Sequence, residues 1–115
     1  MAEISPKKRV SKWTKLVRAN DVPPSAAKFV AVGDMELAIF RLENPDRFVV
    51  TRNSCPHAGG NLAAGKIEGA RVTCPWHQWQ FDLDSGACTF NETVTLRSYD
   101  CKVVEGFVYA HLTGS

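Results

Sequence analysis

The sequence lacks long apolar runs. No uninterrupted apolar run exceeds four residues in the 115-residue chain, whereas a transmembrane helix needs about 20. The basic N-terminus is not followed by an apolar segment, so it does not read as a secretory signal. We therefore expect a cytoplasmic protein that contacts no membrane. The length suits one domain with a real hydrophobic core, without room for a separate catalytic domain.

Helical periodicity is also missing. No window repeats apolar residues at the 3.6-residue spacing of a helix for more than two turns. Short apolar stretches instead alternate with Gly, Pro, Asn and Asp, which predicts an all-β domain of short antiparallel strands. We expect a hairpin turn at 33–34 and a tight turn at 84–86. The expected strands are 13–17, 29–32, 35–42, 48–51, one near 67, 71–73, 81–83, 93–96, 99–104 and 107–112.

Basic residues are unevenly distributed along the chain. Residues 1–18 hold six Lys or Arg and one Glu, a charge of +5, so a total of +2 leaves −3 for the remainder. We expect 1–12 to be a flexible basic arm and 13–115 to form the folded domain. Such an arm could contact nucleic acid or an acidic partner, but a solvated, frayed terminus is the expected case. The body shows no basic stripe with interleaved aromatic residues, so we expect no nucleic-acid binding.

Cysteine and histidine are scarce, at four and three residues, and most of them fall in two short segments. Cys55 and His57 form a C-x-H motif, and after sixteen further residues Cys74 and His77 form a C-x-x-H motif. Without an export signal, such cysteines indicate metal binding or free thiols rather than disulfides. Two Cys and two His at these spacings can bind zinc or an iron–sulfur cluster.

Each segment offers one sulfur and one nitrogen donor after a predicted strand. A dinuclear cluster with mixed ligands needs two sulfur donors on one iron and two nitrogen donors on the other. Two opposed loops, about 53–66 and 74–81, would meet this requirement symmetrically. The first loop is rich in Gly, Ala, Asn and Pro, which permits close backbone approach. A structural zinc module using the same four residues remains the alternative, and it would be colourless.

From residues 13 to 112 the sequence resembles the Rieske-type [2Fe–2S] proteins. The family's two half-motifs are met at the right separation by Cys55, His57, Cys74 and His77, and 74–86 resembles the corresponding family stretch. The resemblance implies one [2Fe–2S] cluster, with both cysteines on the inner iron and both histidines on the outer iron through Nδ1. It also implies an antiparallel β-sandwich with a small cluster-binding subdomain inserted between strands.

The sequence departs from the respiratory-complex branch of that family. Gly60 and Trp76 stand where those members carry a disulfide, and Trp79 and Phe81 stand where they carry Ser and Tyr hydroxyls that donate to cluster sulfurs. Such hydrogen bonds favour the reduced state. At ~1–3 kcal/mol each, losing both lowers the potential on the order of 100–250 mV. The resemblance therefore implies a soluble, low-potential ferredoxin, with a midpoint around −150 mV.

The resemblance implies an electron carrier without a catalytic site of its own. Its redox partners would be a reductase and a terminal oxygenase or similar enzyme. Once the cluster ligands are assigned only His111 remains, so a second site of two histidines and a carboxylate for mononuclear iron cannot be built. Residues 95–99 also resemble the small subunit of assimilatory nitrite reductase, and the enzyme-subunit alternative stays open.

Five further residues receive structural expectations. Cys88 and Cys101 have no histidine at ligand spacing, so we expect free thiols that behave as small apolar side chains. We expect Trp79 to pack beneath the second loop, and Gly65 to serve backbone geometry rather than ligand contact. His111, far from both motifs in the sequence, is expected to be an ordinary surface or core histidine.

Overall fold

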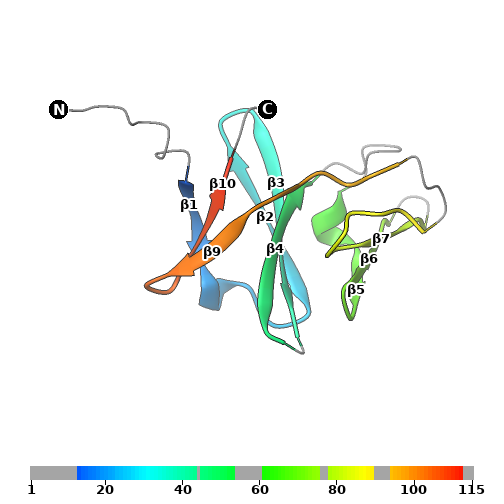
Figure 1. The fold of residues 1–115 in the computed structure, drawn as a ribbon, viewed down its shortest axis with the longest axis horizontal. Coiled ribbons are helices and arrows are strands. Elements are labelled where there is room, and N and C mark those ends of the chain that lie inside the picture. Colours follow the sequence, from blue (N-terminus) through cyan, green and yellow to red (C-terminus); the bar gives the residue numbers. More distant parts are fainter. Residues whose placement is uncertain (1–12, 44, 54–60, 76–77, 90–93, 113–115) are drawn as a thin grey trace.

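The structure is a computed structural model that describes residues 13–43, 45–53, 61–75, 78–89 and 94–112. The predicted basic arm, residues 1–12, lies outside the described residues. No helix in the described ranges is long and apolar enough to cross a membrane. The elements are β1 (Trp13–Arg18), η2 (Ala19–Asp21), β2 (Ala26–Val32), β3 (Met35–Leu42), β4 (Arg47–Arg52), η3 (Leu62–Ala64), β5 (Lys66–Glu68), β6 (Arg71–Thr73), β7 (Gln80–Asp82), β8 (Ser98–Tyr99), β9 (Cys101–Val104) and β10 (Phe107–His111) (Figure 1).

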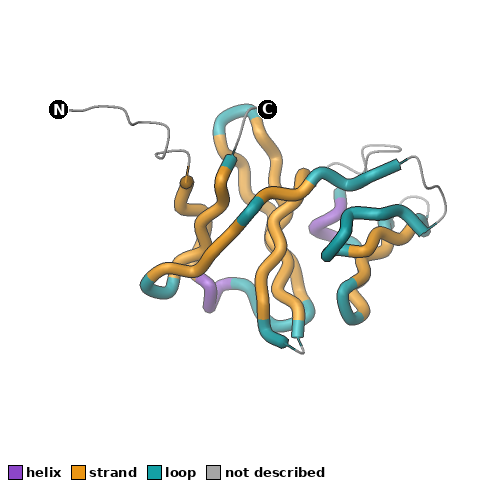
Figure 2. The backbone as a smooth tube through the Cα atoms, viewed as in Figure 1, coloured by secondary structure: helices purple, strands orange, loops and turns teal. Residues whose placement is uncertain are grey.

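The strands form three antiparallel sheets, which confirms the all-β prediction. Their orders are β1-β10-β9, β2-β3-β4-β8 and β5-β6-β7. The first two sheets pack on each other as a sandwich, and the first strand of the described chain pairs with the last. The third sheet comes from the chain between β4 and β8 and lies to one side, beyond β4 (Figures 1 and 2). The chain is therefore a β-sandwich with a small inserted subdomain.

The predicted strands 93–96 and 99–104 were wrong in detail. In residues 94–96 the structure has a single bridge, Ala87 with Thr95, because that segment bonds to the turn at Gly86 through the Leu96 N–H instead of to a neighbouring strand. The stretch 99–104 divides into β8 and β9, which belong to different sheets. β2, by contrast, is longer than predicted: it begins at Ala26, whereas the predicted strand begins at residue 29.

β3 is buried on both faces because it lies between two hydrophobic cores. Ala38, Phe40 and Leu42 point to one core, whereas Leu37 and Ile39 point to the other. We call the first the subdomain core; its buried members are Ala38, Phe40, Leu42, Leu62, Val72, Cys74, Phe81, Leu83, Cys88 and Leu96. We call the second the sandwich core; its buried members are Val22, Leu37, Ile39, Val50, Tyr99, Val108 and Ala110.

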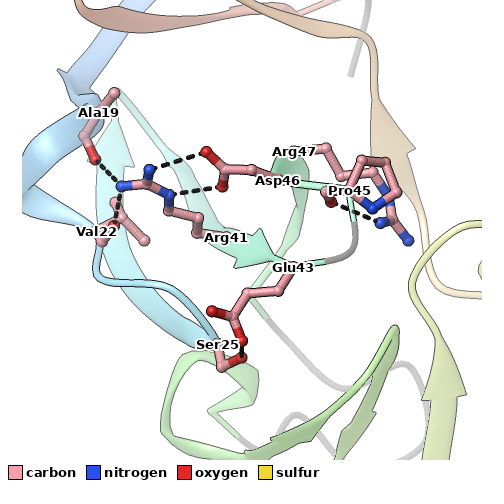
Figure 3. A network of polar contacts seen from close by, with 8 residues as sticks. All are labelled: Ala19, Val22, Ser25, Arg41, Glu43, Pro45, Asp46 and Arg47. Carbon is pink, nitrogen blue, oxygen red and sulfur yellow. Dashed lines mark hydrogen bonds and ion pairs between the residues drawn. The ribbon is translucent and has the colours of Figure 1, made fainter.

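Arg41, near the end of β3, ties the β1–β2 connection to the β3–β4 turn. Its guanidinium donates to both carboxylate oxygens of Asp46 at 2.9 Å, and its Nη1 donates to the carbonyls of Ala19 at 3.4 Å and Val22 at 3.1 Å (Figure 3). This hydrogen-bonded pair holds the pKa of the Asp46 carboxyl below its usual range. Three separate segments of the chain are therefore joined by one side chain.

Candidate metal centre

Asn53 closes the base of the first predicted metal-binding segment. Its carbonyl accepts from the Leu62 N–H at 2.9 Å, and its side-chain Oδ1 accepts from the Ala63 N–H, also at 2.9 Å. Its own N–H donates to the Glu36 carbonyl at 2.8 Å. Asn53 is only 6% exposed, and these bonds join the described residues on either side of 54–60 to each other and to Glu36 of β3.

Cys74 begins the second segment, at the end of β6. Its N–H donates to the Trp79 carbonyl at 2.7 Å, and its carbonyl accepts from the Gln78 N–H at 3.0 Å. Gln78 has a φ of +64°, the left-handed conformation that reverses a chain sharply. The chain therefore leaves β6, turns within a few residues, and returns as β7 with its ends hydrogen-bonded.

The flanks of the two segments are in contact. A Cβ on Gly65 would overlap the Thr73 carbonyl oxygen and would lie 3.0 Å from Cγ2 of Val72. The backbone after the first segment therefore lies directly against the backbone before the second. Leu62 and Cys74 are moreover buried in the same subdomain core. The expectation that Gly65 serves backbone geometry is confirmed.

An ion pair links the subdomain to the sandwich. Arg47, the first residue of β4, donates to Asp84 through Nε at 3.3 Å and through Nη2 at 2.9 Å. The predicted turn after β7 holds Asp84 in place, because Asp82 Oδ1 accepts from the N–H groups of Asp84 and Ser85. Gly86 completes that turn with a φ of +82°. The bidentate geometry restrains the subdomain relative to β4.

Of the four predicted ligands, the structure describes Cys74; Cys55, His57 and His77 lie outside the described residues. Cys74 is fully buried and is not part of a disulfide. Within the described ranges no group of three or more His, Cys, Asp or Glu is placed to hold a metal. A buried thiol at the start of a tightly closed turn, close to the closed base of the other segment, fits a cluster held by paired loops.

The remaining sequence expectations concern residues away from this turn. Cys88 and Cys101 are free thiols, as expected. Cys101 Sγ donates to the Phe48 carbonyl at 3.1 Å, and burial, with the nearby Asp100 carboxylate, raises the pKa of that thiol. Trp79 packs against the subdomain core, which confirms its predicted role. His111 belongs to β10, on the other sheet of the sandwich.

Sequence reasoning missed the residues that hold the flanks in place. Asn53 could have been noticed as a polar residue between a strand and the first motif. The left-handed Gln78 left no signal, because glutamine does not ordinarily mark such a turn. The Arg47–Asp84 pair joins positions 37 residues apart and could not be read from the sequence.

An open polar groove of about 470 Å³ runs beside the second segment. Pro75 and Gln78, which flank the undescribed residues 76–77, both line it. Its other polar side chains come from β5, β6 and β7, and include Lys66, Glu68 and Gln80. The surface next to the predicted ligands is thus hydrogen-bonding in character.

Fold and site together define a small antiparallel β-domain whose inserted subdomain holds the buried Cys74 at the start of a closed turn. The family model of the Rieske [2Fe–2S] domain matches residues 12–100. The chain belongs to this family, and its cofactor is a Rieske-type [2Fe–2S] cluster. The family thereby decides between the two metals that the motif had left open, zinc and iron.

Two curated relatives differ greatly in length. The ferredoxin CarAc of Metapseudomonas resinovorans is 32% identical over 99 residues, which cover 84% of this chain and 91% of that protein. Cholesterol 7-desaturase nvd of Hemicentrotus pulcherrimus is 34% identical over 77 residues, which cover 66% of this chain but only 16% of the relative. The chain therefore spans nearly the whole of the ferredoxin but a small part of the desaturase.

Solved structures show the same fold. A chain in the complex of reduced oxygenase and oxidized ferredoxin in carbazole 1,9a-dioxygenase matches with a TM-score of 0.77 and 32% identity, covering 86% of this chain and 92% of that one. A putative NADH-dependent nitrite reductase small subunit from Mycobacterium tuberculosis matches with a TM-score of 0.80 and 23% identity. The match covers 90% of this chain and 96% of that chain. The latter likeness concerns the fold alone.

Replacing Asn53 should weaken the first segment. Asn53→Ala leaves the Ala63 N–H without its acceptor, which should lower the free energy of unfolding by about 1–3 kcal/mol and reduce the iron bound per chain. Asn53→Asp retains an acceptor oxygen and should recover part of both. Thermal unfolding and an iron assay measure the effect, and equal iron content in all three proteins would contradict it.

Adding a methyl group at Gly65 should separate the two flanks. Gly65→Ala forces Thr73 to move, at a cost of about 1–3 kcal/mol, and should lower the iron content. Gly33→Ala is the matched control, because a Cβ on Gly33 would have no neighbouring atom within 4 Å, although the backbone φ of +59° disfavours alanine. It should strain only the β2–β3 turn, by about 1–2 kcal/mol, and keep the cluster's visible absorbance. Full absorbance in Gly65→Ala would disprove the spacing argument.

Proposed function

We propose that Cys55, His57, Cys74 and His77 hold the [2Fe–2S] cluster, and that the chain carries single electrons between a reductase and a terminal oxygenase or similar enzyme. The two cysteines would bind one iron and the two histidines the other. The observation that carries the proposal is the direct contact between the flanks of the two segments at Gly65 and Thr73. That contact supports the proposal, because the chain that follows the C-x-H motif lies against the chain that precedes the C-x-x-H motif.

The ferredoxin relatives support a carrier rather than a fragment of an oxygenase. CarAc is matched over 91% of its length, and the ferredoxin component of the naphthalene 1,2-dioxygenase system of Pseudomonas putida over 88%, at 30% identity. The sequence has three histidines, and once His57 and His77 are assigned to the cluster only His111 remains. It lies on β10 with its ring 5.1 Å from that of Trp13, which does not suit a second iron site.

When bound, the cluster supplies one-electron exchange between a neutral oxidised and a singly negative reduced state. The chain supplies rigidity around it. Two backbone hydrogen bonds close the turn that begins at the buried Cys74, and Asn53 closes the other segment. Trp79 and Phe81 pack in or against the subdomain core and bring no hydroxyl to this region. The proposed setting is a cytoplasmic carrier, with 13–115 as its cluster domain.

The enzyme-subunit alternative differs in its partner rather than in its cofactor. The nitrite reductase small subunit from Mycobacterium tuberculosis shares this fold at 23% identity, which supports no further likeness. Co-purification with a large flavin- and haem-containing protein would favour the subunit over a free carrier.

The ligand assignment can be tested with two cysteines of the same core. Cys74→Ala should abolish the bound iron and the visible absorbance of the cluster. Cys88→Ala is the matched control, because Cys88 is also buried in the subdomain core, at 4% exposure. It should keep two irons and two sulfides per chain, with a loss of stability of about 1–2 kcal/mol. A full cluster in Cys74→Ala would refute the assignment.

A measurement of the reduction potential tests whether the cluster sulfurs lack hydroxyl hydrogen-bond donors. We expect a midpoint around −150 mV, at the low end of the Rieske range. Phe81→Tyr adds a hydroxyl at a fully buried position beside the second segment. It should raise the midpoint by on the order of 40–130 mV if the hydroxyl reaches a cluster sulfur. Phe48→Tyr, in the sandwich, should leave it unchanged. A wild-type midpoint well above +150 mV would rule out the low-potential assignment.

A further inference from the structure

The outer face of the sheet β1-β10-β9 gathers cations around aromatic rings. Directly paired residues of antiparallel strands share a face. Tyr109, in the central strand, is paired with Lys15 on one side and Lys102 on the other. Arg18 is paired with Phe107 in the same sheet. We call this the basic face; its members are Trp13, Lys15, Arg18, Lys102, Phe107 and Tyr109.

A β-bulge places two of the cations together. The register shifts between Lys15 and Val17, so Leu16 is an extra residue in β1. Without the bulge, Lys15 and Arg18, three residues apart, would point to opposite faces of the strand. With it, Lys15 Nζ lies 4.3 Å and Arg18 Cζ 5.7 Å from the centre of the Phe107 ring.

The third cation is held by another ring. Lys102 of β9 reaches across β10, and its Nζ lies 4.1 Å from the centre of the Trp13 ring on β1. Cation–π contacts of this kind restrain side chains that otherwise sample many rotamers. Lys15, Arg18 and Lys102 are all exposed, so they form a partly ordered group of positive charges at the surface.

These charges are not neutralised by the described part of the chain. Arg41 and Arg47 each form a bidentate ion pair, whereas none is found in the described residues for Lys15, Arg18 or Lys102. The acids nearest to Lys102 in sequence, Asp100 and Glu105, lie beyond the two ends of β9. β1, β9 and β10 occupy the end of the molecule opposite to β5, β6 and β7 (Figure 1).

We infer that the basic face is a docking site for a carboxylate-rich surface of a partner protein, remote from the metal centre. Uncompensated positive charge is complementary to such a surface and accelerates its encounter. Restrained cations also lose less side-chain entropy on binding. Binding here leaves the cluster end free and keeps it at high effective concentration near the same assembly.

Single-stranded nucleic acid fits this face less well. Proteins that bind it stack bases on open aromatic faces along a charged groove. Here one face of Phe107 and one face of Trp13 are covered by cations. Three charges also provide few phosphate contacts, and each would weaken rapidly with salt.

The test uses the cluster-loaded protein and a fluorescein-labelled poly-L-glutamate peptide, with binding measured by fluorescence anisotropy at low salt. The variant Lys15→Gln/Arg18→Gln/Lys102→Gln should raise Kd about tenfold or more. The matched control Lys28→Gln/Arg71→Gln/Arg97→Gln removes the same charge from exposed positions outside the basic face and outside the groove beside the second segment. It should change Kd by less than about twofold. Iron content and midpoint potential should stay unchanged in both proteins.

Single variants keep the test decisive if the triple variant folds poorly. Lys15→Gln and Lys102→Gln should each raise Kd about two- to threefold, and Lys102→Arg should bind as the wild type does. Equal losses in the face and control variants would overturn the proposal, because binding would then depend on net charge alone. A basic-face-dependent preference for an oligothymidylate of equal charge would also overturn it, in favour of nucleic acid.

Discussion

The contact between Gly65 and the Thr73 carbonyl is the constraint on which the metal-binding subdomain depends. Because no side chain fits between them, the backbone that ends the first segment and the backbone that begins the second are held at contact distance. Asn53 and the turn after Cys74 then close each segment separately with backbone hydrogen bonds. A pair of short loops can thus be positioned by a small sheet, β5-β6-β7, without any long helix or disulfide in the described residues.

β3 supports both ends of the molecule. One of its faces contributes Phe40 to the subdomain core, and the other contributes Ile39 to the sandwich core. The metal-binding subdomain and the sheet that carries the basic face are therefore built on opposite sides of a single strand. The Arg47–Asp84 pair adds a polar restraint on the subdomain side. This arrangement keeps the metal-binding subdomain and the basic face apart while fixing their relative position.

Charged residues are used in two different ways. Arg41 and Arg47 make bidentate contacts with carboxylates that connect separate segments of the fold. Lys15, Arg18 and Lys102 contact aromatic rings, which order their side chains but leave their charge uncompensated in the described residues. A cation that is paired with a carboxylate attracts a further acidic partner only weakly. A cation that lies over an aromatic ring still attracts one, because the ring carries no net charge. This difference separates structural charges from recognition charges.

Most of the strands and the metal-binding chemistry could be predicted from local sequence patterns. The apolar stretch 35–42 after the turn at 33–34 predicted β3, and the spacing of Cys74 and His77 predicted a metal-binding loop, because apolar stretches and ligand spacing are both properties of neighbouring residues. The ligand set itself remains a prediction, since the structure describes only Cys74 of the four.

What only the tertiary structure decided involves residues that meet across the chain. The division of 99–104 between two sheets, the Gly65–Thr73 contact and the Arg47–Asp84 pair all depend on which strands become neighbours. The sequence showed no basic and aromatic stripe, because Lys15 and Lys102 reach one face only after β1 and β9 have paired with β10. The sequence by itself determined the strand content and the family motif; long-range strand pairing, which no short window encodes, decided the rest.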